Sequence, residues 1–381
     1  MYSVESHSFQ ERQALLRLAG PHDRLGSLME LRAGRCDYRA GNQKATQVCR
    51  SMRLCDEVLA KMDRMQRDLE QVLATYDIIQ PEVSTHVLYR ERWTHPDRKA
   101  HFASVWGTLR SEKRWNIAFG GLVNHGPDTS TEEGSVLNLS FRRGIWEDWP
   151  RSLPHCARFR DIYPVICSPY CATLLHEAVI HALEQEYLKN SPLTPKIGSP
   201  FCHPELTLSD DPELPGLAGS MKFDDTGNPA SQTQLIHRGC FLGDLSLGRG
   251  VMRRASYKSL PLVRTTNMVI HPGTSKPVDW LQSARDCYLI AWIESGKWLP
   301  GTQTIEIVTG PVFRIHKGEP TSFFPELKLR FQSLTFLKAF LEIGDDTRLD
   351  PLVHWCVKEK QGVPMHLLSP SLLVDNCFRR I

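Results

Sequence analysis

The sequence predicts an α+β protein of two domains. Residues 1–155 are expected to form an N-terminal domain of helices and an antiparallel sheet that binds substrate or a partner. Residues 156–381 are expected to form a C-terminal, mainly antiparallel β domain with one histidine-bearing helix. The chain has 381 residues, which exceeds one typical domain. In the first third of the chain, apolar residues recur with the period of an α-helix. In the second half, short apolar runs between glycine-containing turns are typical of strands.

The N-terminal region contains two segments with a helical period. Apolar residues from Ser51 to Tyr76 recur at intervals of three and four, with charged residues between them, which predicts an amphipathic helix. A shorter helical pattern surrounds Phe9 to Leu18. The charged residues of the longer segment are expected to form its solvated face.

Three alternating segments follow and predict an antiparallel meander. They are Val87–Trp93, His101–Trp106 and Trp115–Gly120. Turn residues at Thr94–Asp97 and Leu109–Lys113 separate them, as in strands joined by hairpins. Their tryptophans are expected to pack within the sheet, because no basic groove accompanies them to favour stacking on bases.

The C-terminal domain is expected to begin after a proline-rich linker at Trp149–Pro154. A short buried strand at Ile162–Cys167 precedes a helix that starts near Pro169 and runs from about Tyr170 to Lys189. A loop rich in proline, serine and glycine then covers Asn190–Gly219. Short strands joined by turns are predicted beyond it, at Met221–Asp224, Gln234–Arg238, Thr265–Ile270, Asp286–Trp292, Gln303–Val308 and Val312–His316.

The predicted C-terminal helix carries His176, Glu177 and His181 in the pattern HExxxH. Imidazoles bind zinc, and an adjacent carboxylate can take a proton from a metal-bound water. Side chains five residues apart diverge by ~140° on an ideal α-helix, so both histidines can bind one ion only where the helix widens or ends near His181. By itself the pattern leaves open an ordinary core helix that carries histidines.

Composition excludes several classes of function. The net charge of +3 is too small to favour nucleic acid or an anionic membrane as a partner. No run of about 18 apolar residues predicts a membrane span, and the polar start of the chain shows no signal peptide. Eleven cysteines without a CxxC pair indicate reduced thiols and a cytoplasmic protein.

Several further motifs carry a family resemblance. They are Tyr163–Val165 leading into Leu175–Val179, then Gly219–Ala230, Thr233–Phe241, Arg253–Tyr257, Leu260–Pro261 and Arg264–Asn267. In order and spacing these motifs resemble the TldD/PmbA family of metallopeptidases, over roughly residues 160 to 375.

The resemblance implies a zinc ion bound by His176, His181 and a cysteine near the C-terminus. The segment Trp355–Pro364 looks like the family's cysteine segment and places this ligand at Cys356, whereas the nearby Cys377 fits less well. Three such ligands leave a fourth position open for water, as catalysis requires.

The implied activity is that of a zinc-dependent peptidase or amide hydrolase, in which Glu177 removes the proton of the water and returns it to the leaving amine. The chain looks like the TldD-like, metal-bearing subunit, with a PmbA-like partner in a heterodimer or with a second copy in a homodimer. Its substrate would be a peptide or peptide-like molecule bound as an added strand. A tailoring enzyme for a small peptide-like natural-product intermediate and a non-catalytic scaffold subunit stay open as alternatives.

The chain departs from the family pattern in two places. Ile180 stands where glycine commonly precedes the second histidine, and its branched side chain restricts the backbone. Residues 1 to about 80 match poorly and are short or diverged for the family, which indicates a different substrate or partner. Glu184 has two interpretations, either orienting a metal ligand or standing exposed on the helix.

Other polar residues in or near the family motifs are not expected to bind the metal ion. His203 and His237 lie outside the ligand pattern and are expected to be incidental. Asp224, Asp225 and Gly227 are expected to form a turn, because aspartate side chains bind nearby backbone N–H groups and glycine permits a positive φ.

Overall fold

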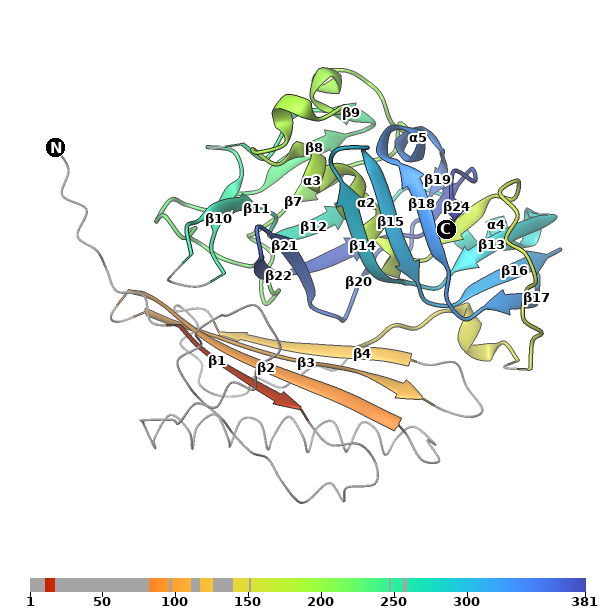
Figure 1. Cartoon of the computed structure of the whole chain (residues 1–381), viewed down its shortest axis with the longest axis horizontal. Coiled ribbons are helices and arrows are strands. Elements are labelled where there is room, and N and C mark those ends of the chain that lie inside the picture. Colours follow the sequence, from red (N-terminus) through yellow and green to blue (C-terminus); the bar gives the residue numbers. More distant parts are fainter. Residues whose placement is uncertain are drawn as a thin grey trace.

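The structure is a computed structural model that describes residues 11–17, 82–95, 98–110, 117–125, 140–150, 152–246, 248–255 and 259–381. A five-stranded N-terminal sheet lies beside a larger body of sheets that encloses a short helical segment (Figure 1). The mixed α and β content and the mainly antiparallel sheets agree with the predicted fold class. The predicted helix Ser51–Tyr76 lies outside the described residues, and the division at residue 155 stays a prediction.

The N-terminal sheet is an antiparallel meander in strand order. Its strands are β1 (Glu11–Arg17), β2 (Glu82–His95), β3 (Arg98–Arg110), β4 (Ile117–His125) and β5 (Ser140–Phe141). The three predicted strands are confirmed as β2, β3 and β4, with longer β2 and β3.

The helical prediction for Phe9 to Leu18 is wrong, because Glu11–Arg17 forms strand β1. It pairs along β2 from Glu11 opposite Arg92 to Arg17 opposite His86. A helix this short is marginal in water, whereas the edge of β2 offers an unbroken row of backbone partners. The partner strand lies far along the chain, so the local period could not reveal it.

A buried ion pair fixes the chain after β5 to the C-terminal body. Arg142 Nε and Nη2 donate to Asp350 Oδ1 and Oδ2 at 2.9 and 2.8 Å, and His354 Nε2 lies 2.8 Å from Asp350 Oδ2. Burial alone would raise the pKa of Asp350, but the charges of Arg142 and His354 hold it well below its ordinary value. The first short 3₁₀ helix, η1 (Ile145–Asp148), follows directly.

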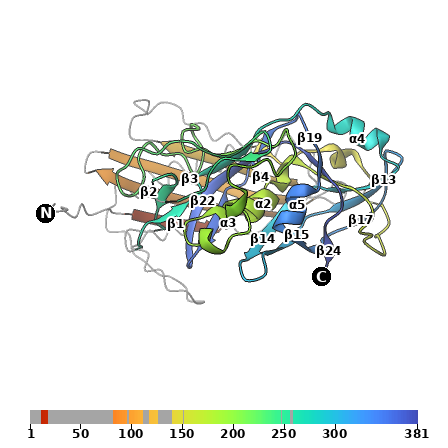
Figure 2. The ribbon, with the colours of Figure 1, turned by 90° about the horizontal axis from the view of Figure 1, so that it is seen from above.

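The described residues of the C-terminal body form four sheets. The strand orders are β17-β16-β13-β6-β23-β19, then β20-β22-β12-β7-β8-β9 with β21 paired to β22, then β14-β15-β18-β24, and finally β10-β11. Only the pairs β13–β6 and β12–β22 are parallel among the described strands. Figure 2 shows α2 and α3 between β22 and β14, near the middle of this body.

The strand bounds are β6 Val165–Cys167, β7 Leu208–Asp210, β8 Thr233–His237, β9 Cys240–Phe241, β10 Val251–Arg253, β11 Leu262–Arg264, β12 Asn267–Ile270, β13 Asp286–Ile290, β14 Ile293–Leu299 and β15 Thr304–Thr309. The remaining strands are β16 Val312–His316, β17 Glu319–Phe324, β18 Lys328–Gln332, β19 Phe340–Ile343, β20 Arg348–Leu349, β21 His354–Lys358, β22 Gln361–Ser369, β23 Leu372–Val374 and β24 Arg379–Arg380. Besides η1 and the central helical segment, the described residues form the helices η4 (Leu188–Asn190), η5 (Thr194–Lys196), α4 (Pro277–Ser283) and α5 (Ser333–Lys338).

Most predicted C-terminal strands are present, and two predictions are wrong. Val312–His316 coincides with β16, whereas Met221–Asp224 forms no strand and belongs to a turn. The predicted loop Asn190–Gly219 contains the strand β7. This strand has three residues, all buried between β12 and β8, so it shows no alternation of apolar and polar residues.

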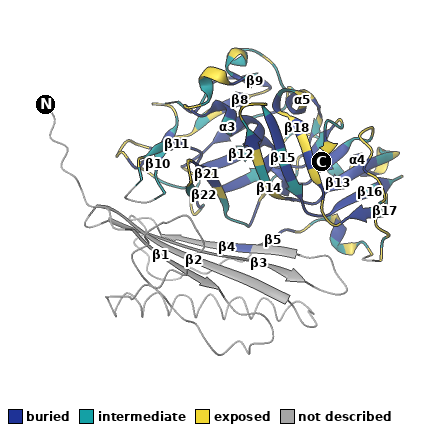
Figure 3. Ribbon diagram, viewed as in Figure 1, coloured by how far each residue is buried: buried dark blue, intermediate teal, exposed yellow. Residues whose placement is uncertain are grey.

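The central helical segment is enclosed by the sheets because most of its side chains are apolar and its polar ones, Thr173, His176 and Glu177, are buried as well. Leu174, Leu175, Ala178, Val179 and Ile180 are all fully buried in the main core. A helix without a solvated polar face is expected in a protein interior. Figure 3 shows the buried residues concentrated there. None of the helices in the described part of the chain has the length and apolar character that crossing a bilayer requires.

His366 on β22 makes the stability of the fold sensitive to acid. It is 2% exposed, and its Nδ1 accepts the Ala218 N–H at 2.9 Å, which requires that nitrogen to be unprotonated. Burial, followed by the charge of His354, lowers the pKa of His366 to about 4. The unfolded chain, with a pKa of about 6.5 at this residue, therefore binds a proton that the folded protein excludes.

We expect this histidine to reduce the free energy of unfolding by roughly 2 kcal/mol between pH 8 and pH 5. The contribution of His366 to stability is fully present above its pKa in the unfolded chain. It is lost as the pH falls toward its pKa in the folded protein. His366→Asn keeps an acceptor for Ala218 and removes the titration, so its urea unfolding curves should lose that much less stability over the same range. Equal losses in both proteins would contradict this explanation.

Candidate metal centre

The central helical segment widens where the two histidines lie. It begins with η2 (Pro169–Cys171), continues as α2 (Thr173–Leu175), becomes a π-helix, η3 (His176–Ile180), and ends with α3 (His181–Leu183). The His181 N–H donates to the carbonyl of His176, an i→i+5 bond that places both side chains on one face. The widening predicted from the HExxxH spacing is confirmed, and Ile180 adopts φ −58° and ψ −56° without preventing it.

The prediction that this helix continues to Lys189 is wrong. Glu184 leaves the helix with ψ 145°, and its neighbour Gln185 donates its N–H to the carbonyl of Leu245 at 2.9 Å. The backbone bridge between Glu184 and Leu245 replaces the next helical turn. The apolar pattern did not show this exit, because the competing partner comes from a distant loop.

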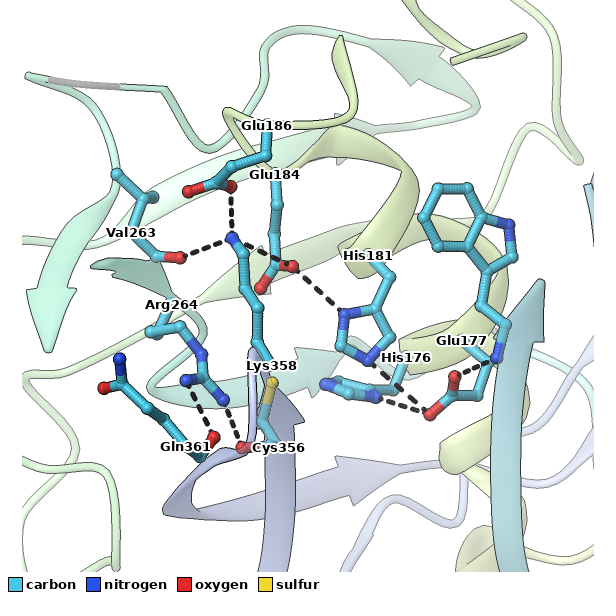
Figure 4. A network of polar contacts seen from close by, with 11 residues as sticks. His176, Glu177, His181, Glu184, Glu186, Val263, Arg264, Cys356, Lys358 and Gln361 are labelled. Carbon is cyan, nitrogen blue, oxygen red and sulfur yellow. Dashed lines mark hydrogen bonds and ion pairs between the residues drawn. The ribbon is translucent and has the colours of Figure 1, made fainter. Parts of the chain in front are cut away.

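The structure brings together the three residues that the sequence proposed as ligands. Ligand atoms of His176, His181 and Cys356 all lie within 4.8 Å of one another. The histidines come from the widened helix and Cys356 from β21, and Figure 4 shows the three side chains converging. Cys377 is not in this group and packs against the main core elsewhere.

Neighbouring carboxylates orient both imidazoles. His176 Nδ1 lies 3.2 Å from Glu177 Oε1, and His181 Nδ1 lies 3.1 Å from Glu184 Oε2. A Nδ1–H that donates to a carboxylate leaves Nε2 as the lone-pair nitrogen of each ring. The buried His176 Nε2 has no hydrogen-bond partner among the described residues, as expected of an atom that binds a metal ion.

The chemistry of these three donors fits zinc. Two imidazole nitrogens and one thiolate are common zinc ligands, and three of them leave one position open for catalysis. Burial raises the pKa of the Cys356 thiol, although His181 and Arg264 act in the opposite direction. A metal ion that binds here therefore displaces a proton from sulfur.

Glu177 is held so that one carboxylate oxygen faces the ligand group. Oε2 accepts the Trp298 N–H of β14 at 2.8 Å, while Oε1 lies 3.2 Å from His176 Nδ1 and 3.8 Å from His181 Nε2. Burial alone would raise the pKa of Glu177, but His181 and His176 outweigh it and lower the value. The side chain is thus ionised and able to accept a proton.

Gly296 on β14 makes room for Glu177. A Cβ at this position would lie 2.7 Å from Glu177 Cγ and 2.9 Å from Thr173 Cγ2, both too close for real contacts. Either the strand or the Glu177 side chain would have to move. The sequence showed only a glycine within a strand, without indicating what approaches it.

The family resemblance implies that Glu177 is the base of a zinc peptidase. On that expectation Gly296→Ala should lower peptide hydrolysis by roughly 10²-fold while zinc stays bound, because a displacement of about 1 Å at a catalytic group has such an effect. Zinc content and initial hydrolysis rates of the purified variant test this. Gly301→Ala is the matched control, since a Cβ there meets nothing within 4 Å. Equal activity of the two variants would show that Glu177 tolerates the methyl group.

Glu184 is buried and contacts a proposed ligand, so its interpretation as an exposed helix residue is wrong. Sequence reasoning missed Lys358, whose Nζ lies 3.3 Å from Glu184 Oε2, and the Trp298 N–H. A signal for Lys358 was available, because residues two apart share one face of a strand and Cys356 precedes it by two. The sequence gives no indication of the role of Trp298, because only its backbone N–H contacts Glu177.

The remaining polar residues of the motifs lie outside the ligand group. His237 is exposed, and the Nδ1 of His203 accepts a local backbone N–H. Asp224 Oδ1 accepts N–H groups of its own turn at 2.8 and 3.0 Å, and Gly227 has φ +89°. Asp225 accepts a backbone N–H from the residue after β10 at 2.7 Å. The predicted turn is confirmed.

The widened HExxxH helix and the cysteine-bearing strand that faces it together form a group of three side chains that could hold a metal ion. The model of the PmbA/TldA metallopeptidase C-terminal domain matches residues 160–378. The chain belongs to this family, which confirms the resemblance seen in its motifs.

Curated proteins that are similar in sequence to this chain are named as metalloproteases. A metalloprotease of Synechocystis sp. is 31% identical over 320 residues, which covers 76% of this chain and 67% of the relative. The TldD homologue of Haemophilus influenzae is 29% identical over 267 residues, covering 64% and 53%, and that of Buchnera aphidicola from Acyrthosiphon pisum is 28% identical over 263 residues, covering 64% and 50%. The chain thus spans about half the length of these two TldD homologues.

Two solved structures share the fold. A Thermotoga maritima protein described as a modulator of a DNA gyrase has a TM-score of 0.58 at 14% identity, covering 98% of this chain and 94% of its own. TldE from Thermococcus kodakarensis has a TM-score of 0.54 at 16% identity, covering 83% and 73%. At these identities the likeness supports the fold alone.

Proposed function

We propose that this chain is a zinc-dependent peptidase whose metal ion is held by His176, His181 and Cys356. One observation carries the proposal: the three ligand atoms lie within 4.8 Å of one another, and Glu177 Oε1 stands beside both histidines. Membership of a metallopeptidase family supports the same function.

Bound zinc supplies Lewis acidity, which lowers the pKa of a water and polarises a peptide carbonyl. The chain's own residues would do the rest. Glu177 receives the proton of the attacking water on Oε1, the oxygen that lies beside both histidines, while Oε2 accepts the Trp298 N–H and keeps the carboxylate in place. Glu177 then transfers that proton to the leaving amine, so the base acts as an acid in the second step. Glu184 keeps the His181 ring in the orientation that presents Nε2.

The proposed substrate is an extended peptide, and the proposed assembly is a dimer with a PmbA-like subunit or with a second copy. The names of the relatives support proteolysis. The complete ligand group supports an enzyme rather than a scaffold subunit, because a scaffold has no need for converging donors. We place this activity in the cytoplasm.

The test uses the full chain, alone and with a PmbA-like partner, on unstructured peptides and on small peptide-like metabolites. We expect about one zinc per chain. We also expect peptide hydrolysis that stops after chelation and returns with added Zn²⁺. Hydrolysis that is insensitive to chelation would refute the metal-dependent mechanism. Hydrolysis of the metabolites alone would replace the peptidase by a tailoring enzyme.

A further inference from the structure

The proposed ligands come from two elements that are distant in sequence, and a chain of polar contacts joins them. Lys358 follows Cys356 by two residues on β21, and its side chain extends toward the helix (Figure 4). Lys358 Nζ lies 3.3 Å from Glu184 Oε2, and the same oxygen lies 3.1 Å from His181 Nδ1. One carboxylate oxygen therefore contacts both the cysteine strand and a ligand imidazole.

Burial makes this pair of charges interdependent. The side chains of Lys358 and Glu184 are 2% and 0% exposed. A buried charge that loses its partner costs several kcal/mol, so each of these groups keeps the other in the interior. The Val263 carbonyl accepts a further hydrogen bond from Lys358 Nζ at 3.2 Å, which restricts the ammonium group to this position.

The other side of β21 is also fixed, but through its backbone and not through a ligand side chain. Arg264 Nη2 donates to the Cys356 carbonyl and Nη1 to the Gln361 carbonyl, the latter at 3.1 Å. The guanidinium thus holds the hairpin of β21 and β22 by its backbone. Within the described part of the chain its hydrogen bonds go to backbone carbonyls and not to either histidine, whereas the ion pair reaches His181 directly.

We propose that the Glu184–Lys358 ion pair positions His181 relative to Cys356 and thereby determines how tightly, and in what geometry, the centre binds a metal ion. Both are positioning residues that act through the ligands. The inference rests on the proposed function, since it assumes that the three ligands bind one ion.

Glu186 offers a matched control on the same lysine. It forms an ion pair with Lys358 Nζ, but its side chain is 32% exposed. It is not in the ligand group, and the residue with which it forms an ion pair is Lys358. A partly exposed ion pair contributes little, so removing Glu186 changes the charge near Lys358 without disturbing His181.

The experiment measures Zn²⁺ affinity of the full chain by competition with a chromogenic chelator, and the absorption spectrum of the Co²⁺ form. We expect Glu184→Gln and Lys358→Met each to weaken Zn²⁺ binding by roughly 10- to 100-fold. The double variant should bind Zn²⁺ about as tightly as the single variant with the lower affinity, because both changes remove the same interaction. Glu186→Gln should stay within about twofold of the wild type.

The Co²⁺ absorption spectrum reports the geometry of the metal ligands. A general loss of protein stability would not change that geometry. We expect the d–d bands to change in Glu184→Gln and Lys358→Met and to stay unchanged in Glu186→Gln. Glu184→Asp is a second test in case Glu184→Gln does not fold. It keeps the negative charge but moves it away from His181 by one methylene, and it should also weaken Zn²⁺ binding. Thermal unfolding of each metal-free variant identifies those that fold.

Two negative results have different meanings. A wild-type chain that binds neither Zn²⁺ nor Co²⁺ would refute the proposed function. A wild-type chain that binds both, together with folded Glu184 and Lys358 variants of unchanged affinity and spectrum, would refute the positioning role alone.

Discussion

Glu177→Gln is expected to abolish most peptide hydrolysis while the protein still binds zinc. General base catalysis contributes typically 10²- to 10⁴-fold, so we expect the rate to fall by roughly that factor. Glutamine has the size of the native side chain and can still accept the Trp298 N–H, so the local packing is retained. The amide cannot take up a proton, which removes the step that the carboxylate performs.

Zinc content and kcat measured on the same preparation separate these two effects. A moderate loss of affinity is compatible with the mechanism, because Glu177 Oε1 also contacts His176 Nδ1 at 3.2 Å. Gly301→Ala provides a preparation with an unaltered site. Full activity of Glu177→Gln with bound zinc would exclude Glu177 as the base and direct attention to another group.

The parts of the site that were predictable from the sequence are those set by local geometry. His176 and His181 are five residues apart, and only a widened or interrupted helix brings both to one side. The spacing therefore predicts one of these two departures from an α-helix, and the structure has the widening. Cys356 has no local relation to them. It was proposed through the family resemblance of its own segment, and no pattern within the histidine segment pointed to it.

What the sequence could not show are contacts made by backbone or by distant strands. The N–H that holds Glu177 belongs to Trp298, and any residue there would donate it. Gly296 is meaningful only once β14 is known to run against Glu177. The strand β1 was mistaken for a helix for the same reason, since its partner β2 lies far along the chain. Local periods describe a segment, whereas these contacts depend on the tertiary arrangement.

Cys356→Ser is expected to remove zinc binding almost completely. Structural zinc sites gain about 10–16 kcal/mol from their full ligand set, so loss of the thiolate should weaken binding by roughly three orders of magnitude or more. A serine hydroxyl does not ionise readily and is a poor replacement. Because Cys356 is fully buried, the variant also places a hydroxyl in the core, at a cost of about 1–3 kcal/mol to the metal-free fold.

Cys377→Ser is the matched control, because Cys377 was the competing candidate in the sequence and its sulfur is absent from the ligand group. It should bind zinc like the wild type. In the Co²⁺ forms, the thiolate-to-metal absorption should disappear only in Cys356→Ser. The reverse pattern, with zinc lost in Cys377→Ser and kept in Cys356→Ser, would mean that the strand bearing Cys356 does not supply the third ligand. The arrangement around His181, Glu184 and Lys358 would then need a different explanation.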